Sequence, residues 1–240
     1  MIIDFDNADS VQKNIKDYIL ENARDFTCEQ YDNLIDRYSL CKSLNDDVIR
    51  IHRDWFNTQL RGSKICAGHF SRVYDLSKIE QGIVTLDCEN HLAQIKDILN
   101  IENFEDKKEI DALEEILLNL SKYLGGIREK RLSFFYPASH TRACAHYTEA
   151  IGGEVIKFNK EKIPNIYQLL CKVGIPILVR ATVPFDEIID YWKGQVIDNI
   201  IRMTLAGEPI WKGELDGRCF ELQIENCLKK KNIKEVIILG

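Results

Sequence analysis

The first 62 residues place apolar side chains at the three- and four-residue spacing of amphipathic helices. Ser10 can cap the first helix. Its apolar face carries four residues: Val11, Ile15, Tyr18 and Ile19. The same spacing predicts a second helix around 31–38 and a third, capped by Asn45, that reaches Phe56. We therefore expect a helical N-terminal region over residues 1–62.

After residue 62 the pattern changes to short apolar runs bounded by turn residues. Strands are predicted over 65–73 and 83–87, with helical turns between them that Gly82 closes. Helices are predicted over 91–99 and 107–124, within an insertion at about 90–125.

From residue 132 strands and helices alternate. The predicted strands are 132–137, 154–158, 175–183, 217–224 and 234–239. The predicted helices are 140–150, 164–173 and 185–205, the last opened by Pro184 and broken near Gly194. The sequence thus predicts an α+β protein in which the helical region is followed by a core, residues 63–240, built on a mixed, split β-sheet with helices.

Composition is that of a globular protein, with 45% hydrophobic and 29% charged residues among 240. The net charge of −6 argues against general affinity for nucleic acid or acidic membranes. One local exception is "KKKNIK", Lys229 to Lys234, which we interpret as a solvated turn rather than a binding patch.

The eight cysteines include no C-x-x-C pair, and none has zinc-ligand spacing with histidine. The N-terminus is acidic, and its apolar part is too short for a signal peptide. No apolar run approaches the roughly 20 residues of a membrane span. We therefore expect a cytoplasmic protein with reduced thiols, no membrane association and no metal.

The stretch "GHFSR" falls inside the first predicted strand of the core. Strand alternation places His69 and Ser71 on one face, with Phe70 and Arg72 on the other. Two hydrogen-bonding side chains on one face of an apolar strand indicate either a binding site or a buried histidine that a backbone carbonyl satisfies. Gly68 allows a ligand or another backbone to approach closely.

A second stretch, "SFFYPASHTRACAHYTEAIGGEVIKF", sets Tyr136 at a strand end and Tyr147 in the helix that follows. The two tyrosines could border one pocket, or belong to the core with their hydroxyls at the surface.

Together these features resemble the ADP-ribosyltransferase fold, in its His-Tyr-Glu branch that includes poly-ADP-ribose polymerases. There the first strand carries a histidine two residues before a serine or threonine, as His69 and Ser71 do here. A tyrosine ends a middle strand and another follows eleven positions later, as Tyr136 and Tyr147 do, and "GGEVIKF" stands where the next strand belongs. The resemblance covers roughly residues 64–239.

The resemblance implies a site for NAD. His69 would bind the adenosine ribose, the backbone of Phe70 the nicotinamide carboxamide, and Ser71 would support that contact. The two tyrosines would sandwich the nicotinamide ring, and Arg72 would meet the pyrophosphate. The chain departs from the family in having Phe70 where glycine is usual, and in the length of its insertion, which could recognise a substrate.

ADP-ribose transfer also needs a carboxylate, because cleavage of the nicotinamide–ribose bond builds positive charge on the sugar. Glu221 in "RCFELQI" lies inside an apolar run, where a solvated glutamate is unexpected. The polar face that it would share with Cys219 and Gln223 could line a cleft or be the wet face of an edge strand. Glu214 and Glu235 are the alternatives.

The predicted function is NAD-dependent transfer of ADP-ribose to a protein or nucleic acid, by a toxin or defence effector that an inhibitory partner could control. The alternative is a non-enzymatic partner-binding protein, such as an inhibitor or an antitoxin-like factor. Two further hypotheses stay open. One is a cysteine hydrolase that pairs Cys144 or Cys66 with a histidine from the set His69, His140 and His146. The other is removal of an RNA 2'-phosphate on the same fold.

Overall fold

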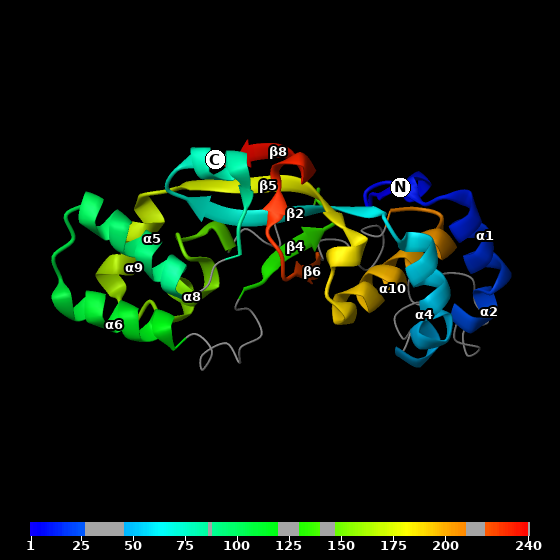
Figure 1. Cartoon of the computed structure of the whole chain (residues 1–240), viewed down its shortest axis with the longest axis horizontal. Coiled ribbons are helices and arrows are strands. Elements are labelled where there is room, and N and C mark those ends of the chain that lie inside the picture. The colour runs from blue at the N-terminus through cyan, green and yellow to red at the C-terminus, as the bar shows by residue number, and fades with distance from the viewer. Residues whose placement is uncertain (27–45, 86–87, 120–129, 140–146, 210–218, 240) are drawn as a thin grey trace. The chain divides into compact units, whose positions relative to one another are not determined.

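The fold is that of a computed structural model, which describes residues 1–26, 46–85, 88–119, 130–139, 147–209 and 219–239. The described residues form helices and a six-stranded sheet in which neighbouring strands include both parallel and antiparallel pairs (Figure 1). The predicted α+β class is confirmed. No helix of the described residues is both long enough and apolar enough to cross a bilayer.

The N-terminal helices are α1 (Lys13–Glu21), α2 (Ala23–Phe26) and α4 (Asp46–Leu60). Helix α1 buries Ile15 and Ile19, as the apolar spacing predicts. The predicted cap is wrong, because Ser10 lies in a short 3-10 turn, η1 (Ala8–Ser10), and its hydroxyl bonds the backbone of Asp4 instead. The helix predicted at 31–38, like Asn45, lies outside the described residues.

The main sheet has the strand order β6-β4-β2-β5-β8, with β1 pairing in parallel onto β2. Its strands are β1 (Ile2–Ile3), β2 (Lys64–Val73), β4 (Leu132–Tyr136), β5 (Ile175–Pro184), β6 (Phe220–Ile224) and β8 (Ile233–Ile238). Strands β2 and β4 run antiparallel with Gly68 opposite Phe135. A second, two-stranded sheet pairs β3 (Gly82–Ile83) with β7 (Leu228–Lys229), so the strand predicted at 83–87 is only two residues long in the described part.

The longer predicted helices of the core are confirmed where the structure describes them. They are α5 (Cys88–Ile101), α6 (Lys107–Leu118), α9 (Pro164–Lys172) and α10 (Asp190–Ala206). Helix α10 runs unbroken through Gly194, contrary to the predicted break, and Pro184 ends β5 rather than opening the helix. Between them lies a 3-10 turn, η5 (Phe185–Glu187).

The strand predicted at 154–158 is wrong: these residues form helix α8 (Gly153–Phe158). Gly152 precedes it with φ of +89°, a left-handed conformation suited to glycine, and a Cβ there would lie 2.5 Å from Ile156 Cγ1. Ile156 is buried whereas Phe158 is 69% exposed, although a strand would set both on one face. The chain therefore lacks, at this place, the strand that the resemblance implies.

Two compact units make up the chain, each assembled from three stretches. The first unit is Met1–Gly68, Ser133–Ala143 and Ala181–Gln223; the second is His69–Leu132, Cys144–Arg180 and Ile224–Gly240. Strands β2 and β5 each pass from one unit to the other along the chain. The two units are defined by which residues pack together, and each contains segments that are distant in sequence. The predicted division into a helical region (1–62) and a core (63–240) therefore stays a prediction.

Each unit has its own core. The six largest fully buried side chains of the described residues are Tyr136, Phe5, Phe26, Phe56, Phe134 and Phe185, and all belong to the first unit. In the second unit helices α5, α6, α8 and α9 gather around an aliphatic cluster that includes Ile95, Leu117, Ile156 and Leu170 (Figure 1).

Candidate functional site

Glu221 lies half-buried on β6 of the first unit, where a glutamine orients it. Gln223, two residues along the same strand face, donates from Nε2 to Glu221 Oε1 at 2.8 Å and to Ser133 Oγ of β4 at 3.2 Å. Only 1% of Gln223 is exposed. The polar face that the sequence predicts is therefore present, and its inner end is tied to the neighbouring strand.

Tyr136, at the end of β4, is completely enclosed. Its ring centroid lies 4.5 Å from that of Phe5 and 5.7 Å from that of Phe220, and its hydroxyl accepts a hydrogen bond from Asn199 Nδ2 at 3.0 Å. Burial raises the pKa of this hydroxyl well above its usual value. A flat ligand could reach the ring only after Phe5 or Phe220 moves.

An ion pair on α10 lies next to this tyrosine. Asp198 accepts from Arg202 at 2.8 and 3.2 Å, and only 13% and 11% of the two side chains is exposed. Burial raises the pKa of Asp198 to about 7, although Arg202 opposes the shift. We call Tyr136, Asp198, Asn199 and Arg202 the Tyr136 cluster. A carboxyl group that titrates near neutral pH occurs both at functional sites and in buried ion pairs.

The three members of the Tyr136 cluster on α10 are not among the site residues that the sequence predicts. Their signal was available in "VIDNIIRM", where Asp198 and Arg202 stand four residues apart within an apolar helix. Asn199 is fully buried, and its Oδ1 accepts no hydrogen bond from the residues that the structure describes.

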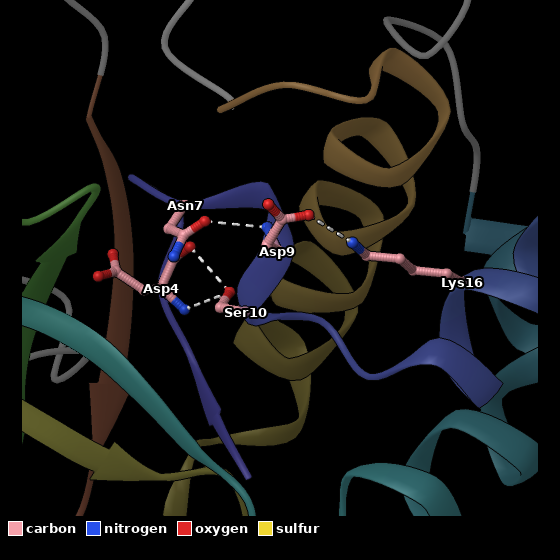
Figure 2. Close-up of polar contacts among 5 residues, drawn as sticks. All are labelled: Asp4, Asn7, Asp9, Ser10 and Lys16. Carbon is pink, nitrogen blue, oxygen red and sulfur yellow. Dashed lines mark hydrogen bonds and ion pairs between the residues drawn. The ribbon is translucent and has the colours of Figure 1, made fainter.

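The acidic N-terminal turn does not gather its carboxylates around one point (Figure 2). Asp4 Oδ1 accepts from the backbone of Asp6, and Asp9 pairs with Lys16 at 3.2 Å, on the other side of the turn in the figure. Asp6 instead holds Ser139, the second residue after Pro137, through both its backbone and its hydroxyl. No group of three or more metal-ligating side chains is present in the described part of the chain.

In the second unit, β2 shows the alternation that its sequence predicts. His69 and Ser71 are half-buried, whereas Phe70 on the other face is only 6% exposed. Arg72 donates from Nε to the carbonyl of Thr148 at 2.8 Å and from Nη1 to that of Gly174 at 2.7 Å. Arg72 therefore joins three segments of this unit, and two of its donors are already used.

The remaining predicted residues are scattered. Tyr147 is half-buried in a short 3-10 turn of the second unit. Glu235 on β8 is exposed and pairs with Arg180 at 3.4 Å. Four predicted residues lie outside the described residues: Glu214 and, for the hydrolase hypothesis, Cys144, His140 and His146.

The predicted site residues divide between the two units. Tyr136 and Glu221 belong to the first, where Phe220, the residue before Glu221, stacks on Tyr136. The other five belong to the second: His69, Phe70, Ser71, Arg72 and Tyr147. Within the second unit Arg72 donates a hydrogen bond to the carbonyl of Thr148, the residue that follows Tyr147.

Comparison with protein-family models, with curated proteins and with solved structures gives no match. Function is therefore inferred from the residues of this chain and their contacts.

Proposed function

We propose that this protein transfers ADP-ribose from NAD to a macromolecular acceptor, with Glu221 as the catalytic carboxylate. The observation that carries the proposal is the position of Glu221 on β6, half-buried and oriented by the buried amide of Gln223. A carboxylate with a fixed direction can stabilise positive charge without reorganising during the reaction.

In the proposed reaction the nicotinamide nitrogen takes the electron pair of the bond to ribose and leaves as neutral nicotinamide. The acceptor nucleophile then bonds to the same ribose carbon and loses its proton to solvent. Glu221 stabilises the cationic sugar between these two events. Gln223 is a positioning residue, since it acts through the carboxylate of Glu221.

For NAD binding we propose the residues that the resemblance implies. The half-buried His69 and Ser71 on one face of β2 support this proposal. Phe70 is compatible with it, because its side chain is buried on the opposite face and leaves its backbone as the contacting group. Arg72 supports it less, since two backbone carbonyls occupy two of its donors.

One observation favours the alternative, a non-enzymatic partner-binding protein. Tyr136 has no exposed side-chain surface, so as it stands it offers no ring for nicotinamide to stack on. A fully buried tyrosine with a hydrogen-bonded hydroxyl is common in protein cores, so its presence does not indicate a ligand site.

Glu221→Gln tests the catalytic assignment, because it keeps the shape and removes the charge. We expect transfer from labelled NAD to fall by about 10²- to 10³-fold, the loss typical of one electrostatic group. The thermal unfolding midpoint should stay close to that of the wild type. Glu225→Gln is the matched control, since Glu225 is exposed near the end of the same strand. Full activity in Glu221→Gln would remove this residue from the mechanism.

A further inference from the structure

Four lysines project from one short segment of the second unit. Lys229 ends β7, Lys230 and Lys231 lie in the 3-10 turn η7 (Lys230–Asn232), and Lys234 lies in β8. All four are exposed, and none makes an ion pair with any described residue. We call these four residues the lysine surface. The sequence alone favours a solvated turn at these lysines, and their charge contrasts with the net charge of −6 of the whole chain.

The backbone under the lysine surface is fixed. Lys229 pairs with Gly82 across the small sheet, and the buried Leu228 and Asn232 anchor the segment on either side of the turn. The approach of the two strands is close: a Cβ on Gly82 would lie 2.5 Å from Leu228 O. The lysines therefore start from defined positions, which lowers the entropy lost when they bind a ligand.

The carboxylates that flank the lysine surface in sequence are already paired. Glu225 lies 3.7 Å from Arg131, and Glu235 lies 3.4 Å from Arg180. The turn that packs against η7 is η3 (Leu76–Gln81), which Asp75 precedes. Hydrogen bonds from Ser77 and, to a smaller extent, the charge of Lys78 lower the pKa of Asp75. More distant carboxylates count little, because salt screens exposed charges beyond about 8–10 Å.

We propose that the lysine surface binds the phosphodiester backbone of a nucleic acid. Ammonium groups that pair with no described carboxylate and start from a fixed backbone suit a repeating row of phosphates, and such binding is independent of sequence. An acidic membrane would also attract lysines, but the segment Glu225 to Lys234 exposes no aliphatic or aromatic side chain to enter a bilayer; the exposed Val236 and Ile238 follow it on β8. The proposal goes beyond ADP-ribose transfer and does not depend on it, because binding needs no NAD.

The test measures binding of the full chain, without NAD, to a fluorescent single-stranded RNA and to a fluorescent duplex DNA between about 50 and 200 mM NaCl. The test variant replaces three residues: Lys229→Gln, Lys230→Gln and Lys231→Gln. The control variant changes net charge equally through three exposed lysines that also make no ion pair with described residues: Lys107→Gln, Lys108→Gln and Lys172→Gln.

We expect the wild type to bind at low salt and the control variant to bind nearly as well. Each lost phosphate contact lowers the slope of log affinity against log salt by about 0.7–0.9, so the test variant should lose about 2–3 in slope. Its affinity should then vary roughly 20- to 40-fold less across that salt range. RNA and DNA arms show which nucleic acid binds more tightly. Unchanged unfolding midpoints confirm that both variants fold.

Three results would overturn the proposal. The first is no binding of the wild type to either nucleic acid at the lowest salt. The second is equal weakening in both variants, which would make net charge alone the cause. The third is binding only to vesicles of phosphatidylcholine and phosphatidylserine at a ratio of about 3:1, which would assign the lysines to a membrane surface.

Discussion

At the scale of single residues, the pKa of Asp198 links the Tyr136 cluster to pH. Burial raises it to about 7 in the folded protein from a usual value of 3.8. At pH values between these two pKa values, Asp198 is protonated in the folded state and ionised in the unfolded state. The free energy of unfolding therefore falls as pH rises from about 4 to about 7, by at most about 4 kcal/mol.

Asp198→Asn should remove this pH dependence, because asparagine imitates the protonated acid at every pH. We expect the wild type to lose stability relative to the variant between pH 5 and pH 7, as measured by urea unfolding at both values. Asp190→Asn on the same helix is the control, since the side chain of Asp190 is 74% exposed and should leave the slope unchanged. A wild type that gains stability relative to Asp198→Asn over this interval would show that Arg202 outweighs burial.

The same cluster shows what a sequence can predict about one residue. The position of Tyr136 at a strand end follows from the apolar run before it and the proline after it. Its enclosure does not, because Phe5 and Phe220 reach it from 131 and 84 residues away along the chain. Burial by segments that are distant in sequence leaves no local pattern. The sequence therefore does not distinguish a Tyr136 that borders a pocket from a Tyr136 that belongs to the core.

At the scale of elements, the helical part of the second unit depends on a carboxylate at a helix start. Glu109 on α6 is 7% exposed and accepts from the backbone of Asn165 at 3.0 Å and of Ile166 at 2.9 Å. These amides belong to the first turn of α9, whose own preceding residue, Ile163, has no side-chain oxygen to cap it. Glu109 therefore replaces the missing cap from another helix, and its charge suits the helix dipole.

Glu109→Ala should destabilise the protein by about 1–3 kcal/mol, since it removes the partner of the buried amide of Ile166 and of the part-buried amide of Asn165. Hydrogen exchange should show α9 opening more readily than α10 does. Glu115→Ala, an exposed position on α6, controls for the change in helix composition and should cost little. Equal exchange in α9 of the two variants would mean that water satisfies the amides.

Helix α8 shows why element type was harder to predict than element position. "GEVIKF" is too short for its periodicity to separate a strand from a helix. The deciding contact is tertiary, since Ile156 enters a cluster built by α5, α6 and α9. In contrast, α5, α6, α9 and α10 are longer and their apolar spacing predicts them correctly. Gly194 does not break α10, because a glycine in a helix costs only about 1 kcal/mol relative to alanine and the residues that α10 buries, from Val196 to Met203, offset that cost.

At the scale of the whole molecule, the α+β class follows from the sequence but the strand order does not. Alternating short runs and amphipathic segments predict the class directly. The placement of β4 between β2 and β6 depends on pairing between residues far apart in the chain, for which one sequence carries no signal. The same holds for the units, whose stretches join the N-terminus to residues beyond 181.

A ligand that binds only the folded chain stabilises all of it, so NAD distinguishes the proposed enzyme from the partner-binding alternative. At an NAD concentration of 100 times Kd, the gain of about 2.7 kcal/mol in the free energy of unfolding should raise the unfolding midpoint by roughly 5–10 °C.

Glu221→Gln should keep this rise while losing transfer, because its lost charge acts on the reacting sugar rather than on binding. His69→Ala should lose the rise. The lysine-surface variant should retain it, since nucleic-acid binding and NAD binding are separate proposals. No rise with millimolar NAD in the wild type would instead favour the partner-binding protein, whatever the lysine surface binds.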